Sequence, residues 1–174
     1  MEFEIGICKY GYEHIPLKIK WINDPYVNKY LHYNLPIDEV NEKQWLSKVI
    51  DDKSRHDCVI EVVKENEHIP VGLIGLIHID NSNRKAEFYV SIGEHEFNNK
   101  GIAYLASMKF LRDTLYSLNL NKVYLYTEVE NNKAQILFEK IGFMKEGLLR
   151  SDLIYNGKMI NRYIYGLLIE DFFD

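Results

Sequence analysis

A turn that could bind an anion lies at Asn98-Asn99-Lys100-Gly101-Ile102-Ala103, directly before a long segment with helical apolar spacing. The first backbone N–H groups of such a helix have no helical partner, and the helix dipole adds partial positive charge there. Gly101 would allow an anion to approach the backbone closely, and Lys100 would add charge. The pattern predicts a seat for a pyrophosphate, although a glycine before a helix is most often only part of a turn.

A second segment with informative spacing runs from Asn131 to Phe143, with the sequence NNKAQILFEKIGF. Most of it is what any amphipathic helix with a stop glycine and a core phenylalanine would contain. That reading does not explain why Asn131 directly follows a predicted strand, at this distance from the turn at 98–103.

Together the two segments resemble the GNAT acetyltransferase superfamily. The first family motif is Arg/Gln-x-x-Gly-x-Gly/Ala, which Gly101 and Ala103 match and from which Asn98 and Asn99 depart. The second is Asn-x-x-Ala-x-x-x-Tyr-x-x-x-Gly-Phe, which is matched at Asn131, Ala134, Gly142 and Phe143. The order of predicted elements agrees with the family over nearly the whole chain, and the two motifs together are far more specific than either alone.

The resemblance implies an N-acetyltransferase that uses acetyl-CoA as cosubstrate and needs no metal. In the family the loop amides bind the CoA pyrophosphate, a role that falls here on residues 98–103. The family asparagine hydrogen-bonds the pantetheine arm, a role carried to Asn131. The end of the preceding strand, Ser91 and Ile92, would pair its backbone with pantetheine.

One departure concerns the group that protonates the leaving thiolate. The family tyrosine often proposed for this step is Phe138 here. A CoA thiol should titrate like cysteine, with a pKa of about 8.5, so its thiolate is a tolerable leaving group near neutrality. Water or Tyr126 could substitute, and Phe138 is expected to pack against the cofactor. An acyl-CoA-binding sensor or interaction module without turnover therefore stays open as an alternative.

The reaction also needs a base, because an alkylammonium has a pKa of about 10.4 and only its neutral form attacks a thioester. Glu87, on the strand before the 98–103 turn, is the first candidate and would act through water. Many relatives in the family have an acidic residue there. The alternative is a solvated residue on an alternating strand. Glu128, on the strand before Asn131, is the second candidate.

The early segment Trp21-Ile22-Asn23-Asp24-Pro25-Tyr26-Val27 and the later Trp45 resemble one GNAT subgroup. This subgroup contains ribosomal-protein N-terminal, spermidine and nucleotide-amino-sugar acetyltransferases. Trp21, His32 and Tyr33 are the candidate acceptor-binding residues, although an ordinary loop role for His32 is the plainer reading.

We expect the acceptor to be a small-molecule amine. The aromatic residues of the early region favour a nucleotide-linked amino sugar, because aromatic rings stack on a sugar or base. A polyamine or a protein N-terminus is the alternative. A polyamine site would want converging carboxylates, but Asp38, Glu39 and Glu42 look like the first turn of a helix, where they favour the dipole anyway.

Hydrophobic periodicity and turn chemistry predict the elements that position these residues. In chain order they are a strand at 3–7, a helical region at 15–30 interrupted by Asn23-Asp24-Pro25, a helix capped by Asp38, strands at 58–63, 71–79 and 86–92, a helix at 101–118, a strand at 122–129, a helix at 133–140 ending at Gly142, and a hairpin of 148–155 and 159–168 around Asn156-Gly157. The second helix is expected to turn Val40, Trp45, Leu46, Val49 and Ile50 to one side. Residues 1–174 form one α/β domain of the GNAT type, with a mixed, mostly antiparallel sheet flanked by helices.

Composition narrows the function further. The net charge of -5 argues against a nucleic-acid partner, and no apolar run is long enough for a membrane span. Cys8 and Cys58 are expected to be buried reduced thiols, and with no signal peptide the default location is cytoplasmic. The six histidines show no metal-ligand spacing. The C-terminal hairpin offers an edge for pairing in a homodimer, but nothing forces that pairing.

Overall fold

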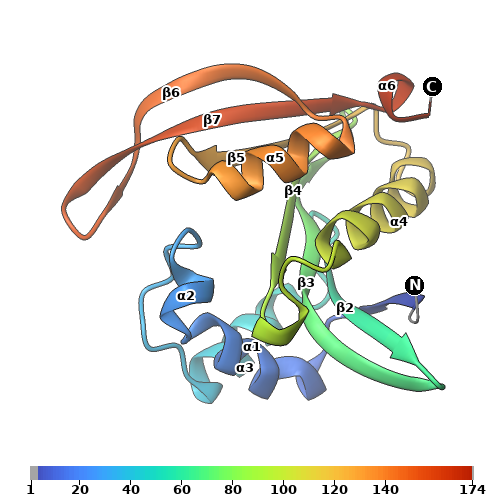
Figure 1. Cartoon of the computed structure of the whole chain (residues 1–174), viewed down its shortest axis with the longest axis vertical. Coiled ribbons are helices and arrows are strands. Elements are labelled where there is room, and N and C mark those ends of the chain that lie inside the picture. The colour runs from blue at the N-terminus through green and yellow to red at the C-terminus, as the bar shows by residue number, and fades with distance from the viewer. Residues whose placement is uncertain (1–3, 174) are drawn as a thin grey trace.

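The computed structural model describes residues 4–173, which fold around a seven-stranded sheet with helices against both faces (Figure 1). The elements in chain order are β1 (Glu4–Lys9), η1 (Tyr12–His14), α1 (Ile15–Ile22), α2 (Pro25–Asn28), α3 (Glu39–Val49), β2 (His56–Lys64), β3 (Glu67–Asp80), β4 (Lys85–Ile92), η2 (His95–Phe97), α4 (Ile102–Ser117), β5 (Lys122–Glu128), α5 (Asn132–Ile141), β6 (Met144–Tyr155), β7 (Lys158–Leu168) and α6 (Ile169–Phe173).

The sheet has the strand order β1-β2-β3-β4-β5-β7-β6. Neighbouring strands are antiparallel except for β4 and β5, which are parallel because α4 connects them. The expectation of a mixed, mostly antiparallel sheet is therefore confirmed. The predicted order of strands and helices is confirmed as well, with α2, α6 and the two short 3-10 helices added.

The larger core lies between the sheet and α4 and α5. Alternate residues of β4, Ala86 and Phe88, are buried on this face, and the Phe88 ring lies 6.2 Å from that of Phe110 on α4. From β5, Val123 and Leu125 are buried on the same face. This alternation is the period-two pattern that allows a strand to cover a helix with every second residue.

A second core lies on the opposite face, beneath α1 and α3. Ile15 and Trp21 of α1 and Leu46 of α3 pack there on Val59 and Leu73 of the sheet. The intervening residues of β4, Tyr89 among them, turn toward this face. The two faces of β4 therefore pack against different layers of the fold.

Local turn and cap chemistry is as predicted. The Asp38 carboxylate accepts the Asn41 N–H at 2.8 Å and caps α3. Gly142 ends α5 with φ 115°, and Asn156 and Gly157 join β6 to β7 with φ 49° and 75°. Asp24 interrupts the early helical region by capping α2 after α1 has ended.

Two expectations about packing are changed. Val40 does not face inward, because it is 65% exposed, while Glu42 and Leu46 form the buried side of α3. Cys58 is buried as expected, whereas Cys8 is only half-buried, and both thiols are free. Within residues 4–173 there is no helix with the length and apolarity that crossing a membrane requires.

Candidate active site

The central feature of the molecule is the divergence of β4 from β5. The two strands pair only where Lys85–Glu87 lies beside Lys122–Tyr124. In Figure 1, β4 then continues from the part of the fold that holds β5 to β7 toward the part that holds α1 to α3. A cleft opens here, lined by Ser91 and Ile92 of β4 and by Asn131 before α5.

The end of β4 presents a strand edge to this cleft. On its other edge, Val90–Ile92 pairs with Gly72–Ile74 of β3. Because β5 has already diverged, the cleft-facing backbone is available to an extended ligand that carries amide groups. The structure thus places Ser91 and Ile92 where strand-like pairing with such a ligand is geometrically feasible.

The turn at 98–103 forms the start of α4, as the sequence predicts. Asn99 and Gly101 both have left-handed backbones, with φ 59° and 77°. The first internal bond of α4 runs from the Leu105 N–H to the Gly101 carbonyl at 3.0 Å, so the amides of residues 102–104 precede the helical ladder. A Cβ built on Gly101 would have no heavy atom within 4 Å. These features are compatible with the binding of a phosphate group at this helix start.

Asn131 lies at the N-terminus of α5, where its side chain both caps the helix and offers a donor to the cleft. Its side-chain oxygen accepts the Ala134 N–H at 3.3 Å, which caps the helix. The same side chain lines the cleft with Ser91 and Ile92, and its amide NH₂ group is a donor that the cap does not use. The tertiary fold thus brings together segments that are forty residues apart in sequence, at 91–92 and 131.

Glu87 lies on the face of β4 that is opposite to the larger core. Its Cα partners are Ile77 on β3 and Tyr124 on β5, and its side chain is 20% exposed. Glu87 is not among the residues that line the cleft or the cavity that adjoins it, although its partner Ile77 lines that cavity. The carboxylate Oε2 is 2.9 Å from Nδ1 of His78. Burial, and after it the charge of Glu87, raises the pKa of Tyr124 and of Tyr126, so both hydroxyls remain protonated near neutrality.

A cavity of about 210 Å³ adjoins the cleft, and Leu31, Val90 and Ser91 line both. Its aromatic wall consists of Tyr10, Tyr33, Trp45 and Tyr89. The site therefore has two compartments that meet at the end of β4.

The charged groups of the cavity are paired. Lys18 Nζ lies 2.7 Å from a Glu42 carboxylate oxygen and 3.7 Å from the centre of the Trp45 ring. Arg55 bonds Asp57 through two nitrogens at 2.9 and 3.0 Å. Burial lowers the pKa of Lys18, and the ion pair with Glu42 opposes that shift. The two cations thus have carboxylate partners from within the chain.

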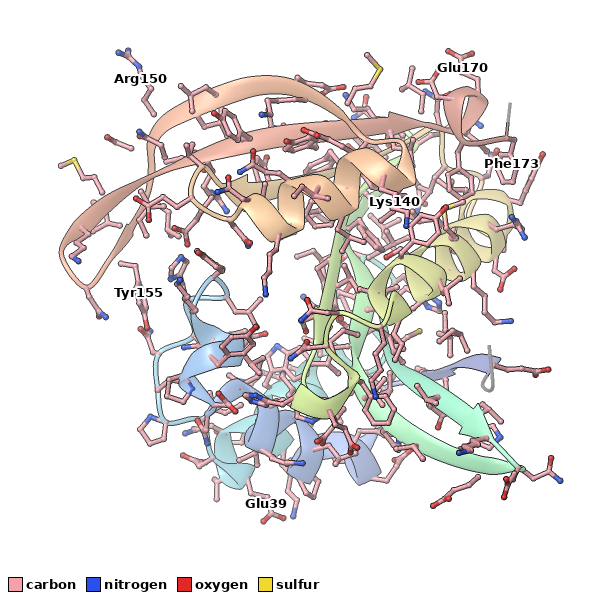
Figure 2. All side chains as sticks on the ribbon, in the orientation of Figure 1. Glu39, Lys140, Arg150, Tyr155, Glu170 and Phe173 are labelled. Atoms are coloured by element: carbon pink, nitrogen blue, oxygen red, sulfur yellow. The ribbon has the colours of Figure 1, made fainter. Side chains whose placement is uncertain are left out.

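Glu128 and His32 lie together beside this site. His32 Nε2 contacts Glu128 Oε1, and both side chains are 11% exposed. The His32 ring is 4.4 Å from the Tyr155 ring, and the Tyr155 hydroxyl donates to the Tyr33 carbonyl at 3.3 Å. Figure 2 shows Tyr155 pointing from the β6–β7 hairpin toward the α2–α3 connection. Glu128 thus holds that connection in place, and it lines a neighbouring hollow rather than the cleft at Ser91.

Two predicted contact residues lie in the core. The Trp21 side chain is 2% exposed, and its Nε1 donates to Glu94 at 2.8 Å, so it is not available to an acceptor. Phe138 is 7% exposed and packs on Phe143 and Tyr165, and it is not among the residues that line the cleft. Tyr33, in contrast, lines the cavity.

The sequence did not predict that Lys18 and Asp57 line the cavity or that His78 contacts Glu87. The helical spacing of Lys18 with Trp21 hinted at an inward position, because the two residues are three apart on α1. Asp57 and His78 carry no comparable local signal, since each is placed by pairing with strands distant in sequence.

An anion seat at a helix start, an open strand edge beside it, an amide donor and an adjoining aromatic cavity fit an acyl-CoA whose acyl group is transferred to a second substrate. The fold and the cleft are those of acyl-CoA-dependent N-acyltransferases. A family model described as an acetyltransferase (GNAT) domain matches residues 9–144, and the chain belongs to this family. It is an acetyl-CoA-dependent N-acetyltransferase.

Known proteins with similar sequences come from the expected subgroups. A spermidine N(1)-acetyltransferase of Vibrio cholerae is 34% identical over 138 residues, which cover 79% of this chain and 72% of that protein. A putative ribosomal N-acetyltransferase of Bacillus subtilis, YdaF, is 38% identical over 97 residues, which cover 56% of this chain and 52% of that protein.

A solved structure extends the likeness to the whole fold. The crystal structure of spermidine N-acetyltransferase from Vibrio cholerae in complex with CoA and spermine has a TM-score of 0.89. Its sequence identity to this chain is 26%, and the match covers 98% of each chain. The resemblance to the GNAT superfamily and to its spermidine and ribosomal subgroups is therefore confirmed.

Proposed function

We propose that this enzyme acetylates a terminal primary amine of a polyamine. The observation that carries the proposal is the likeness, over 98% of both chains, to an acetyltransferase whose crystal structure contains CoA and spermine. This acceptor replaces the amino sugar preferred from the sequence alone, because the matched relatives whose names state a small-molecule acceptor are spermidine acetyltransferases. The enzyme would thus act on a flexible aliphatic cation rather than on a sugar ring.

The residues of the cleft divide the work of holding the cosubstrate. Gly101 and the amides of residues 102–104 would bind the pyrophosphate, helped by the helix dipole. The cleft-facing backbone of Ser91 and Ile92 and the NH₂ group of Asn131 would bind the amide-bearing arm. Acetyl-CoA supplies a thioester carbonyl carbon, at which the C–N bond forms while the C–S bond breaks.

Glu87 is the proposed base. It would take one proton from the acceptor ammonium, directly or through one water molecule, and so generate the free amine. As the amide forms, the attacking nitrogen gives up its second proton and the departing thiolate takes up one proton, so the transfer balances. Phe138 has no group that could relay this proton. The Tyr126 hydroxyl lies on the same sheet face as Glu87 and remains protonated near neutrality, so it is a candidate donor besides water.

The acceptor side suits an aliphatic cation. The face that carries Glu87, Tyr124 and Tyr126 combines a carboxylate with two aromatic rings, and an alkylammonium interacts favourably with both. The aromatic wall of the adjoining cavity suits methylene groups. The cavity cations Lys18 and Arg55 are already paired with carboxylates, so their charges do not require an anionic acceptor.

The test is a panel of amines assayed with acetyl-CoA by thiol release and mass spectrometry. The panel contains spermidine, spermine, putrescine, a nucleotide-linked amino sugar and a peptide with a free N-terminus. We expect kcat/KM to be highest for a polyamine, and Glu87→Gln to lower it about 10²-fold with unchanged acetyl-CoA affinity. Faster turnover of the sugar or the peptide would contradict the polyamine proposal.

The pH dependence separates the base from other roles of Glu87. At a pH above about 10.4 the free amine dominates without enzymatic help. The difference in kcat/KM between the wild type and Glu87→Gln should therefore become smaller as pH rises toward that value. A gap that is constant at every pH would argue against Glu87 as the base.

A further inference from the structure

The strand next to Glu87 contains a β-bulge. Two residues of β3, His78 and Ile79, lie opposite the single residue Ala86 of β4. His78 has φ 51°, a left-handed conformation that is uncommon for a residue with a side chain. In a regular strand, His78 would point to the opposite face from its neighbour Ile77, which is the Cα partner of Glu87. The bulge instead turns the imidazole to the side of Glu87.

The bulge is held from outside the β3–β4 pair. The Ile79 N–H donates to the carbonyl of Ser54 at 2.9 Å, in the connection before β2. The extra residue therefore has a backbone partner of its own, and the position of His78 depends on three separate segments of the chain. Left-handed backbone at a residue other than glycine costs on the order of 1 kcal/mol and persists only where the surroundings impose it.

The contact between the two side chains has a defined direction. Nδ1 of His78 is 2.9 Å from Oε2 of Glu87. An ionised carboxylate can only accept, so Nδ1 carries the proton and donates it. The His78 side chain is 68% exposed and that of Glu87 20% exposed. Such an exposed pair contributes little to folding stability, so stability is a weak reason for the bulge.

Other polar side chains lie near Glu87 but do not hydrogen-bond its carboxylate as His78 does. Tyr124 lies beside it in the parallel register, and Tyr126 is the next residue on that face of β5. Lys85 Nζ is 5.9 Å from the centre of the Tyr124 ring, and Arg162, 4.5 Å from that of Tyr126, is paired with Asp152. Among the described residues, His78 is the one that hydrogen-bonds the Glu87 carboxylate.

We propose that His78 is a positioning residue for the Glu87 base. Its Nδ1–H holds Oε2, which leaves Oε1 as the oxygen that can accept a proton and restrains the rotamer of the carboxylate. The inference rests on the proposed role of Glu87 in proton removal. A base that needs no reorientation before each proton transfer acts more efficiently, because the correct geometry exists before the acceptor arrives.

Kinetics of a double-mutant cycle test the proposal. We expect His78→Ala to lower kcat about 10-fold with the KM for acetyl-CoA unchanged, because the machinery for the cosubstrate is untouched. His78→Asn keeps an N–H donor and should restore most of the activity. In the Glu87→Gln background, His78→Ala should cause no further loss. The same 10-fold loss in that background would overturn the proposal.

A matched control lies at the other end of β3. His68 Nδ1 is 2.8 Å from Glu61 Oε2, and its side chain is 58% exposed, so the contact resembles that of His78 but does not involve Glu87. His68→Ala should leave kcat unchanged. An equal loss from His68→Ala would mean that removing any surface histidine of this strand slows the enzyme, which would also overturn the proposal.

A second measurement does not depend on the acceptor. ¹⁵N spectra of the imidazole should show the Nδ1–H tautomer of His78 in the wild type, and a shift toward the Nε2–H tautomer in Glu87→Ala. If the polyamine proposal fails, the kinetic cycle can be run with whichever amine is acetylated. The ¹⁵N spectra require no acceptor and test the contact directly. An unchanged tautomer ratio in Glu87→Ala would overturn the contact itself, whatever the acceptor.

Discussion

The indole ring of Trp21 lies directly against Gly93, so that a Cβ built on Gly93 would be 2.1 Å from Cγ of that ring. Trp21 also donates Nε1–H to Glu94 at 2.8 Å, and the same carboxylate binds Lys20 at 2.6 Å. The connection from β4 to the phosphate seat is therefore fixed on α1 by a glycine, an indole and an ion pair.

Gly93→Ala should disturb both stability and cosubstrate binding. A buried indole cannot move aside, so the connection after β4 must shift, at a cost of about 2 kcal/mol. We expect a lower Tm in thermal unfolding and weaker acetyl-CoA binding by calorimetry. Gly147→Ala is the control, because its added Cβ would meet Ile164 at an ordinary 3.6 Å. Unchanged binding and Tm in Gly93→Ala would contradict this account.

Gly101→Ala should weaken acetyl-CoA binding about 10-fold through the backbone alone. Its φ of 77° is unfavourable for alanine by about 1 kcal/mol, and relaxing that strain would move the amides of the phosphate seat. Gly157, in the β6–β7 turn, has φ 75° and the same open surroundings. Gly157→Ala should lose similar stability in urea unfolding but retain its acetyl-CoA affinity. Equal affinities in the two variants would refute a role of the Gly101 backbone.

His32→Ala should raise the KM for the acceptor about 10-fold and leave acetyl-CoA affinity unchanged. The change breaks a part-buried contact to Glu128, worth about 2 kcal/mol, that holds the α2–α3 connection against β5. Steady-state kinetics with each substrate varied will separate the two effects. Tyr155→Phe removes only the hydroxyl that donates to the Tyr33 carbonyl and should have a smaller effect. If Glu128→Gln instead abolishes kcat with KM intact, Glu128 and not Glu87 is the base.

Stability should fall between pH 9 and about 11 because of the two thiols. Burial, and for Cys8 also the charge of Glu61, raises the pKa of Cys8 from 9.0 to about 11. Burial raises that of Cys58 from 9.0 to about 12. Above pH 9 the unfolded chain loses these protons first, so the free energy of unfolding decreases with pH in this window and is unaffected below it.

The measurement is urea unfolding at pH 7.5 and 10.5 for the wild type and for Cys8→Ala/Cys58→Ala. We expect the double variant to lose less stability between the two pH values, by on the order of 1 kcal/mol. Buried tyrosines such as Tyr10, whose pKa is also raised, change the free energy of unfolding equally in both proteins, so their contribution cancels when the two pH dependences are compared. Parallel slopes would show that the thiols titrate normally in the folded protein.

Much of the local architecture follows from short-range chemistry and is predictable from the sequence. Asp38 caps α3, Asn156 and Gly157 close the last hairpin, and Gly142 ends α5, because each depends on backbone conformations that only a few residue types adopt easily. The helix start at Gly101 belongs to the same class. These positions need no knowledge of the rest of the chain.

Burial is harder to predict, because it depends on what a second element brings. Trp21 reads as a possible binding residue near a turn, yet Gly93, seventy-two residues later, leaves space for its ring and makes it part of the core. Val40 has the helical spacing of a core residue but faces solvent, because α3 covers the sheet with Leu46 and a Lys18–Glu42 pair instead. Apolar spacing alone does not show which side of a helix has a partner.

The proposed acceptor side of the site depends on contacts between segments that are far apart in sequence. The residues proposed to hold acetyl-CoA could be predicted from the sequence, because Gly101 and Asn131 both lie at helix starts, which are local features. The cavity beside Tyr89, the contact of His32 with Glu128 and the bulge that turns His78 to Glu87 come from strand pairing and from segments that meet across the sheet. The physical reason is that register and divergence of strands are set by long-range contacts, and no local pattern encodes which side chains those contacts bring together.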